Sequence, residues 1–272
     1  MTSKPKVTLV TCASMPNLFH GEEGLPDELA QRGCDPRIAV WNDPDVDWDD
    51  AGMVVVRSVS DYAADRSAFL EWARGLRRVQ NSADVLDWNT DKHYLRDLAA
   101  RGLPTIPTSW LEPEHGLSKH QIHTRFPAFG EFVIKPAVSS GVRDIGRYTT
   151  LSISQRQAAM RQVQALLREG RSVMVQRYME EIEVHGEISL VFFNGLVSHA
   201  VEKRAALHPA SITDPTVHEA VVTAEPADSV AWKWGEEIRR VLHDYVRERN
   251  GHDDLLLFNR VDLVPDGHGS FM

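Results

Sequence analysis

A single lysine stands at the end of an apolar stretch and directly before a loop of small residues. The stretch ends in Lys135, Pro136 follows it, and the loop contains Ser139, Ser140 and Gly141. A buried ammonium is costly unless an anion pairs with it, and the N–H groups and hydroxyls of such a loop can cover a phosphate. The sequence therefore predicts that lysine and loop bind one anionic ligand. The alternative is a lysine at a strand end beside an ordinary surface turn.

Two familiar phosphate-binding motifs are excluded for this loop. It has no Gly-Lys-Ser/Thr, and it lacks the Gly-x-Gly-x-x-Gly pattern of dinucleotide-binding folds. A second lysine, Lys92, falls in the first turn of a helix predicted over Thr90–Arg101. The helix dipole disfavours a cation there unless an anion is near, so Lys92 is a further phosphate candidate.

Arg260 and Asp262 form a second group of charged residues. Polar and apolar residues alternate over Asn259–Val264, which is typical of a strand, so Arg260 and Asp262 should project from the same face. An ion pair between them is the simple structural interpretation, and it would contribute less than about 1 kcal/mol if exposed.

The composition limits the class of protein. The chain has 272 residues, is 42% hydrophobic and carries a formal net charge of -9, which argues against general binding to nucleic acid or to an anionic membrane. Its only cysteines, Cys12 and Cys34, lack metal-ligand spacing and form no disulfide framework, as expected in a reducing cytoplasm. The segment Met1–Lys6 is too short for a signal or a membrane span. The expected ligand is small.

The N-terminal part, residues 1–85, is predicted to be a parallel α/β domain, because its strands are nearly all apolar. Strands are expected at Val7–Val10, Pro36–Val40 and Met53–Val59, and helices at Leu25–Arg32 and Asp65–Val79. Ligands of open α/β sheets collect at the carboxyl ends of strands, so Ser14 and Arg57 are candidate substrate contacts. The alternative, which the sequence favours slightly, is that Arg57 only caps or pairs at a strand end.

Residues 86–272 are predicted to form a second domain, with a small lid at roughly 115–175 and a C-terminal subdomain at 176–272. Expected strands are Thr105–Leu111, Phe132–Lys135, Arg147–Tyr148 and Val173–Val175, and expected helices are His115–Thr124, a helix capped by Ser154 and running to Glu169, and Ser229–Arg249. Asn194-Gly195 predicts a hairpin of Ile188–Phe193 with Leu196–Val201. A mobile loop is expected over Ala205–Asp228. After Asn259–Val264 a turn leads to a returning strand that begins at Ser270 and is expected to continue past Met272.

The order of these features resembles the ATP-grasp superfamily, and within it the carboxylate-amine ligases similar to glutathione synthetase. The resemblance covers roughly residues 86–272 and rests on Lys92, the Val-Ile-Lys-Pro strand with its serine-glycine loop, Val-Gln-Arg-Tyr-Met at 175–179, and Arg-Val-Asp at 260–262. It implies an ATP-grasp fold with an α+β lid, preceded by a parallel α/β pre-ATP-grasp domain.

The resemblance also implies ATP and Mg²⁺ as cofactors and gives each candidate residue a role. Lys92 and Lys135 would contact the phosphates, the 139–141 loop would close over them, and Glu183 or Glu187 would meet the ribose. Asp262 would bind Mg²⁺, a hard cation that prefers carboxylate oxygen, and its partner glutamate would follow Met272. The adenine would be read by Gln176, Arg177, Tyr178 and Met179, the transferring phosphoryl would be stabilised by Lys135, Arg204 and Arg260, and Arg143 is a further substrate candidate.

The tryptophan- and aspartate-rich segment Trp41–Trp48, the Val54–Ser58 strand and the Trp88–Lys92 segment resemble a narrower branch of this superfamily, the cyclo-ligases that close O-ureido-D-serine to D-cycloserine. The resemblance implies an amino-acid-like substrate activated as an acyl phosphate, no nucleic-acid or membrane partner, and a homodimer by analogy. Two alternatives remain. One is a ligase that joins two separate amino acids or modifies a peptide, and the other is a kinase-like or regulatory ATP-binding module.

Overall fold

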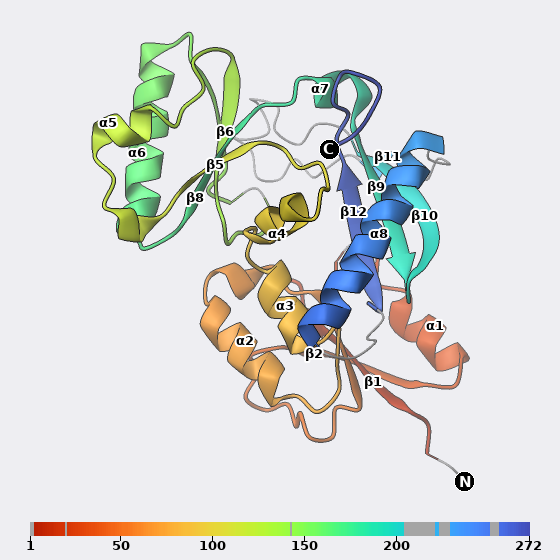
Figure 1. The fold of residues 1–272 in the computed structure, drawn as a ribbon. Coiled ribbons are helices and arrows are strands. Elements are labelled where there is room, and N and C mark those ends of the chain that lie inside the picture. Colours follow the sequence, from red (N-terminus) through yellow and green to blue (C-terminus); the bar gives the residue numbers. More distant parts are fainter. Residues whose placement is uncertain (1–2, 20, 142, 204–220, 223–228, 251–255) are drawn as a thin grey trace. The chain divides into compact units, whose positions relative to one another are not determined.

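The computed structural model describes residues 3–19, 21–141, 143–203, 221–222, 229–250 and 256–272. The chain divides into two compact units, Met1–Thr90 and Asp91–Met272 (Figure 1). Within the described ranges, no helix combines the length and apolar character that crossing a membrane requires.

The first unit is built on a four-stranded parallel sheet, as predicted. The strand order is β2-β1-β3-β4, and β1 pairs in parallel with both β2 and β3. Its strands are β1 (Lys6–Thr11), β2 (Asp35–Val40), β3 (Met53–Ser58) and β4 (Val79–Gln80), and its helices are α1 (Leu25–Gln31), the single turn η1 (Asp61–Ala63), α2 (Arg66–Gly75) and α3 (Ala83–Asn89). The first three strands lie where the sequence predicts them, and β4 was expected to be the end of a helix.

The core of this unit is aromatic. Phe69 on α2 is 1% exposed and packs edge-to-face on Trp41, with the ring centroids 5.5 Å apart. Val10 and Val54 come from adjacent strands to the same cluster. The aromatic stripe of α2 is therefore core, as the sequence indicates. Gly52 begins the approach to β3 at φ +70°, and a Cβ there would lie 2.3 Å from the carbonyl oxygen of Lys6, so only glycine fits.

The segment after β4 corrects the sequence prediction. A helix was expected over Thr90–Arg101. The residues just before Thr90 form helix α3 instead, and the next helix, α4 (Tyr94–Ala100), begins later than predicted. Ser82 caps α3 by accepting from the Val85 N–H at 3.4 Å, and Thr90 closes it by donating to the Leu86 carbonyl at 2.7 Å. Lys92 consequently lies in the turn before α4. The prediction that it falls in the first turn of a helix was wrong.

The second unit contains a four-stranded antiparallel sheet in the order β5-β8-β6-β7, here called the lid sheet. Its strands are β5 (Thr108–Leu111), β6 (Glu131–Pro136), β7 (Gly146–Thr149) and β8 (Val173–Arg177), with η2 (Pro113–His115), α5 (Lys119–His123) and α6 (Ile153–Arg168) between them. Helices α5 and α6 lie on one face of this sheet (Figure 1). There Phe132 and Ile134 of β6 pack fully buried with Val163 of α6. The cap of α6 is Ser152 rather than the predicted Ser154.

A second antiparallel sheet, in the order β11-β10-β9-β12, completes the unit. Its elements are β9 (Glu187–Phe193), β10 (Leu196–Lys203), β11 (Val221–Val222) and β12 (Phe258–Leu263), together with α7 (Glu181–His185) and α8 (Ser229–Asn250). The predicted Asn194-Gly195 hairpin of β9 and β10 is confirmed. Helix α8 lies against β9 and β12 (Figure 1), so close that a Cβ on Gly235 would meet Leu190 at 2.2 Å.

The chain after β12 turns back on itself. Val264 and Met272 exchange backbone hydrogen bonds of 2.9 and 2.8 Å, and Pro265 bridges Phe271. The loop predicted over Ala205–Asp228 lies outside the described residues except at β11, which is a strand.

Candidate active site

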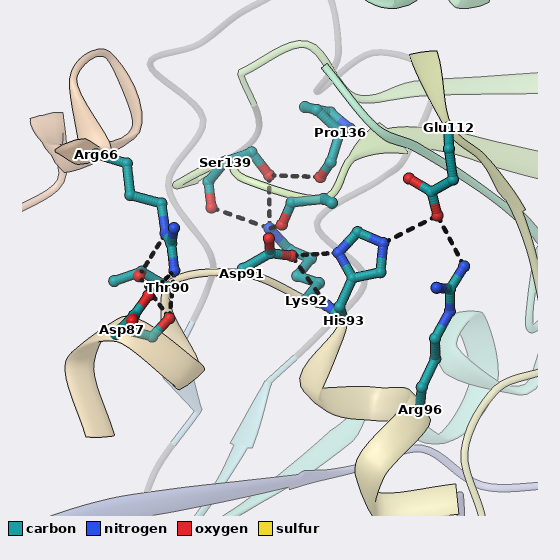
Figure 2. A network of polar contacts seen from close by, with 11 residues as sticks. Arg66, Asp87, Thr90, Asp91, Lys92, His93, Arg96, Glu112, Pro136 and Ser139 are labelled. Atoms are coloured by element: carbon teal, nitrogen blue, oxygen red, sulfur yellow. Dashed lines mark hydrogen bonds and ion pairs between the residues drawn. The ribbon is translucent and has the colours of Figure 1, made fainter. Parts of the chain in front are cut away.

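Lys92 is held against the loop that follows β6. Its Nζ donates to the Ser139 hydroxyl at 2.7 Å and to the carbonyl oxygens of Ser139 and Ala137 at 3.0 and 3.3 Å. Its backbone N–H donates to the Ala137 carbonyl at 3.0 Å. Figure 2 shows the ammonium in the middle of these acceptors. Lys92 and Ser139 of the serine-glycine loop, which are 47 positions apart in sequence, are therefore in direct contact.

Lys92 and Lys135 also influence each other electrostatically. Burial, and secondly the charge of Lys135, lowers the pKa of Lys92 to about 8, while Asp91 offsets part of this effect. Burial lowers the pKa of Lys135 as well, and Glu187 opposes that shift. Two neighbouring lysines whose pKa values are lowered by burial, and in the case of Lys92 also by the charge of Lys135, are typical of a site that an anion completes.

Lys135 projects from the lid-sheet face opposite α6. Side chains alternate along a strand, and Phe132 and Ile134 pack toward α6, so Lys135 lies on the other face. The strand register places Met174 of β8 directly beside Lys135, and Trp110 of β5 beside Met174. Met174 is fully buried and Trp110 is half-buried, so the neighbours of Lys135 along this face of the sheet are apolar.

The segment 176–179 at the end of β8, predicted to read the adenine and called the hinge from here on, is tied to the lid sheet through Arg147. The Arg147 guanidinium lies 3.6 Å from the centroid of the Tyr178 ring, and its NH1 donates to Glu183 Oε1 at 2.5 Å. The Tyr178 hydroxyl donates to the same oxygen at 2.5 Å, and burial together with this hydrogen bond raises the pKa of Tyr178. Arg147 also contacts Glu131 on β6. Glu183, one of two ribose candidates, is thus engaged within the protein.

The other hinge candidates differ in exposure. Gln176 is 5% exposed and donates from Nε2 to the Thr108 hydroxyl at 2.7 Å. Arg177 is exposed, with its guanidinium 4.6 Å from the ring centroid of Phe129, and Met179 is half-buried.

Arg260 and Asp262 share a face of β12, as predicted, and are paired with each other. The guanidinium donates from Nε to Oδ1 at 2.7 Å and from NH2 to Oδ2 at 2.9 Å. Ser189 on β9 donates to Asp262 Oδ1 at 2.6 Å. Asp262 is about one-third exposed, and its oxygens are the kind that Mg²⁺ prefers when substrate phosphates supply further ligands.

The remaining candidates of the second unit are dispersed. Ser140 is half-buried, whereas Gly141, at φ +61°, and Arg143 are exposed. Arg204 lies outside the described residues. Among the side chains that the structure describes, no three histidines, cysteines or acidic residues are grouped closely enough to hold a metal ion.

In the first unit, Ser14 follows the carboxyl end of β1, and Arg57 is the next-to-last residue of β3. Ser14 is exposed, and its hydroxyl lies 3.2 Å from the Cys12 sulfur. Arg57 pairs with Glu22, which also accepts from the Ser58 hydroxyl at 2.9 Å. The pairing that the sequence leaves open for Arg57 is therefore present.

Sequence reasoning missed a polar network beside Lys92. Asp91 Oδ1 lies 2.6 Å from His93 Nδ1, and His93 Nε2 lies 3.1 Å from Glu112 Oε1 (Figure 2). Arg96 donates to the same Glu112 oxygen at 2.8 Å. Burial raises the pKa of Glu112, but hydrogen bonds from Ser172, His93 and Arg96 outweigh it and leave the pKa below its usual value. No local periodicity connects these residues, so the sequence carries no signal for the network.

Comparison with known proteins places this geometry in a family. The family model described as "D-cycloserine synthetase DcsG, N-terminal domain" matches residues 7–83. The cycloserine biosynthesis protein DcsG of Streptomyces lavendulae is 34% identical over 248 residues, which cover 88% of this chain and 79% of that protein. This chain belongs to the D-cycloserine synthetase DcsG family.

Solved structures agree with that assignment. The crystal structure of D-cycloserine synthetase DcsG matches 98% of this chain and 89% of its own, with a TM-score of 0.82 and 30% identity. The ATP-grasp ligase PsnB, in a complex with Mg and ADP, matches 99% of this chain and 89% of its own, with a TM-score of 0.58 and 14% identity, and so shares the fold. The chain therefore has the ATP-grasp fold and is an ATP-dependent ligase.

Proposed function

We propose that this protein converts O-ureido-D-serine to D-cycloserine at the expense of ATP. The observation that supports the nucleotide part is the contact of Lys92 with the Ser139 loop, together with the lowered pKa of both Lys92 and Lys135, because burial disfavours their charged forms and a bound anion would favour them. The substrate is proposed from the family, whose curated member is a cycloserine biosynthesis protein.

The chemistry proceeds in two transfers. A carboxylate oxygen of the substrate attacks the γ-phosphorus of ATP, and the bond from that phosphorus to the bridging β-phosphate oxygen breaks. ADP departs, and the substrate becomes an acyl phosphate. The nitrogen bound to the side-chain oxygen then attacks the acyl carbon, and the C–O bond to phosphate breaks as the five-membered ring closes. That nitrogen carries a carbamoyl group in O-ureido-D-serine and none in D-cycloserine, so one water must also break the bond between this nitrogen and the carbamoyl carbon. The nitrogen keeps a proton, and the carbamoyl group leaves as carbamic acid, which decomposes to carbon dioxide and ammonia. The protein contributes mainly position and charge.

Each residue has a defined part in this proposal. Lys92 and Lys135 bind the phosphates, and the backbone of the 139–141 loop covers them. Glu183 is engaged by Arg147 and Tyr178, and Glu187 acts electrostatically on Lys135, so both glutamates stay candidates for the ribose. The remaining proposed contacts are those of the hinge residues Gln176, Arg177, Tyr178 and Met179 with adenine, and of Arg204 and Arg260 with the transferring phosphoryl.

Mg²⁺ is part of the proposal. Asp262 would hold it together with the nucleotide phosphates, and a bound Mg²⁺ would neutralise phosphate charge. Arg260 donates to both carboxylate oxygens of Asp262, so Mg²⁺ would share this carboxylate with the guanidinium or displace it toward the transferring phosphoryl. We also propose that the protein is cytoplasmic, because Cys12 and Cys34 are free thiols. A homodimer is proposed by analogy with the family.

One reaction tests the proposal. Purified protein is supplied with ATP, Mg²⁺ and O-ureido-D-serine, and products are measured by mass spectrometry and by phosphate release. We expect D-cycloserine, ADP and phosphate in equal amounts, and ammonia from the carbamoyl group. A stable phosphorylated product would instead indicate a kinase. A dipeptide formed from free amino acids, with no ring product, would indicate an intermolecular ligase.

A further inference from the structure

The turn that carries Lys92 is part of a closed ring of hydrogen bonds. The Lys92 N–H donates to the Ala137 carbonyl at 3.0 Å, and the Ala137 N–H donates to the Ser172 carbonyl at 2.9 Å. The Ser172 side chain hydrogen-bonds Glu112, and Glu112 Oε1 lies 3.1 Å from His93 Nε2. Since His93 follows Lys92 in the chain, the ring closes on itself.

His93 is the side chain that links this ring to the lysine turn. Asp91 Oδ1 accepts from the His93 backbone N–H at 3.0 Å and faces Nδ1 at 2.6 Å. Both ring nitrogens therefore face carboxylate oxygens, which only accept, and the imidazole bridges the residue before Lys92 to Glu112 at the end of β5 (Figure 2). Removing the ring would free the turn from the lid sheet on this side.

Packing fixes the plane of the imidazole. The rings of His93 and Trp110 are stacked, with centroids 4.3 Å apart and an interplanar angle of 24°. The Arg96 guanidinium lies 4.6 Å from the Trp110 centroid, and Arg96 also holds Glu112. Glu112 is only 8% exposed, so it is a fixed anchor rather than a mobile surface carboxylate.

We propose that His93 is a positioning residue for ATP, which holds the Lys92 ammonium in register with the Ser139 loop by bridging Asp91 to Glu112. The imidazole itself does not touch the nucleotide. This inference rests on the proposed phosphate contact of Lys92. A displacement of about 1 Å in a binding group can lower a reaction rate about 100-fold. Loss of His93 should therefore weaken nucleotide affinity and raise the KM for ATP.

A double-mutant cycle tests the proposal. The affinity for ADP is measured by titration calorimetry for the natural protein, His93→Ala, Lys92→Met and the double variant. We expect His93→Ala to weaken binding on the order of tenfold when Lys92 is present and to have no further effect in the Lys92→Met background. The matched control is His120→Ala, because His120 is an exposed histidine on α5, and it should bind ADP as the natural protein does.

The cycle separates this inference from the proposed function. Equal weakening by His93→Ala in both backgrounds would show that His93 acts independently of Lys92 and would overturn the positioning role alone. Unchanged ADP binding by Lys92→Met would overturn the phosphate contact of Lys92 and the role of His93 with it. If His93→Ala does not fold, His93→Phe, which can keep the stack on Trp110 but removes both ring nitrogens, enters the same cycle with the same criteria.

Discussion

Nucleotide binding should be coupled to proton uptake through Lys92. The pKa of this ammonium falls from 10.5 to about 8, chiefly through burial and then through Lys135. The shift of roughly 2.5 units corresponds to about 3 kcal/mol by which the folded, ligand-free protein disfavours the charged lysine. Because the unfolded chain binds the proton up to the higher pKa, stability gains from this group as pH rises from about 8 to 10.5.

A bound phosphate should reverse the shift, because a nearby anion favours the ammonium. With a pKa of about 8 in the free protein, Lys92 is about half neutral at pH 8 and about nine-tenths neutral at pH 9, and ADP binding should take up those fractions of a proton. The same equilibrium makes ADP affinity fall about tenfold between pH 7 and pH 9, or about 1.4 kcal/mol.

Titration calorimetry in buffers of different ionisation enthalpy measures this uptake directly. The control is Lys92→Met, which removes the titrating group and leaves any contribution of Lys135. We expect the uptake at pH 9 to be larger in the natural protein by close to one proton. Identical uptake in the two proteins, or an affinity that does not fall with pH, would refute the argument that burial and repulsion hold Lys92 ready for an anion.

Three further substitutions test other parts of the structure. Asp262→Asn should lower kcat on the order of 100-fold while changing the free energy of unfolding by less than about 1 kcal/mol, since the pair is partly exposed; unchanged phosphate release at saturating Mg²⁺ would contradict its metal role. Gly52→Ala should destabilise the first unit by more than about 1 kcal/mol in urea unfolding, because its Cβ would meet the Lys6 carbonyl; an unchanged midpoint would show that the backbone yields there. Phe132→Ala should cost about 3–5 kcal/mol, seen as a lower urea midpoint for the lid sheet, and a loss below about 1 kcal/mol would mean that the cavity collapses.

The sequence was informative where local chemistry decides the structure. Asn194 and Gly195 adopt positive φ values of 49° and 73°, as the tight turn demands, and the hairpin forms as predicted. The alternation over β12 correctly placed Arg260 and Asp262 on one face. In both cases the deciding interactions lie within a few residues of each other.

The sequence was misleading where distant contacts decide. Thr90 and Asp91 look like the start of a helix, yet Thr90 ends α3, and the Lys92 N–H is taken by the Ala137 carbonyl far along the chain. The link from His93 to Glu112 joins residues on different elements, and no propensity predicts it. The roles of the candidate residues in binding ATP and substrate stay predictions.

The two core clusters described for this chain have separate consequences for sequence change. The aromatic cluster around Phe69 draws its members from the first unit, and the cluster around Phe132 draws its members from the lid sheet and its helices. The two clusters share no residue, so each is open to sequence change through its own members. A compensating second substitution for a lost side chain in one cluster is therefore expected among the members of that same cluster.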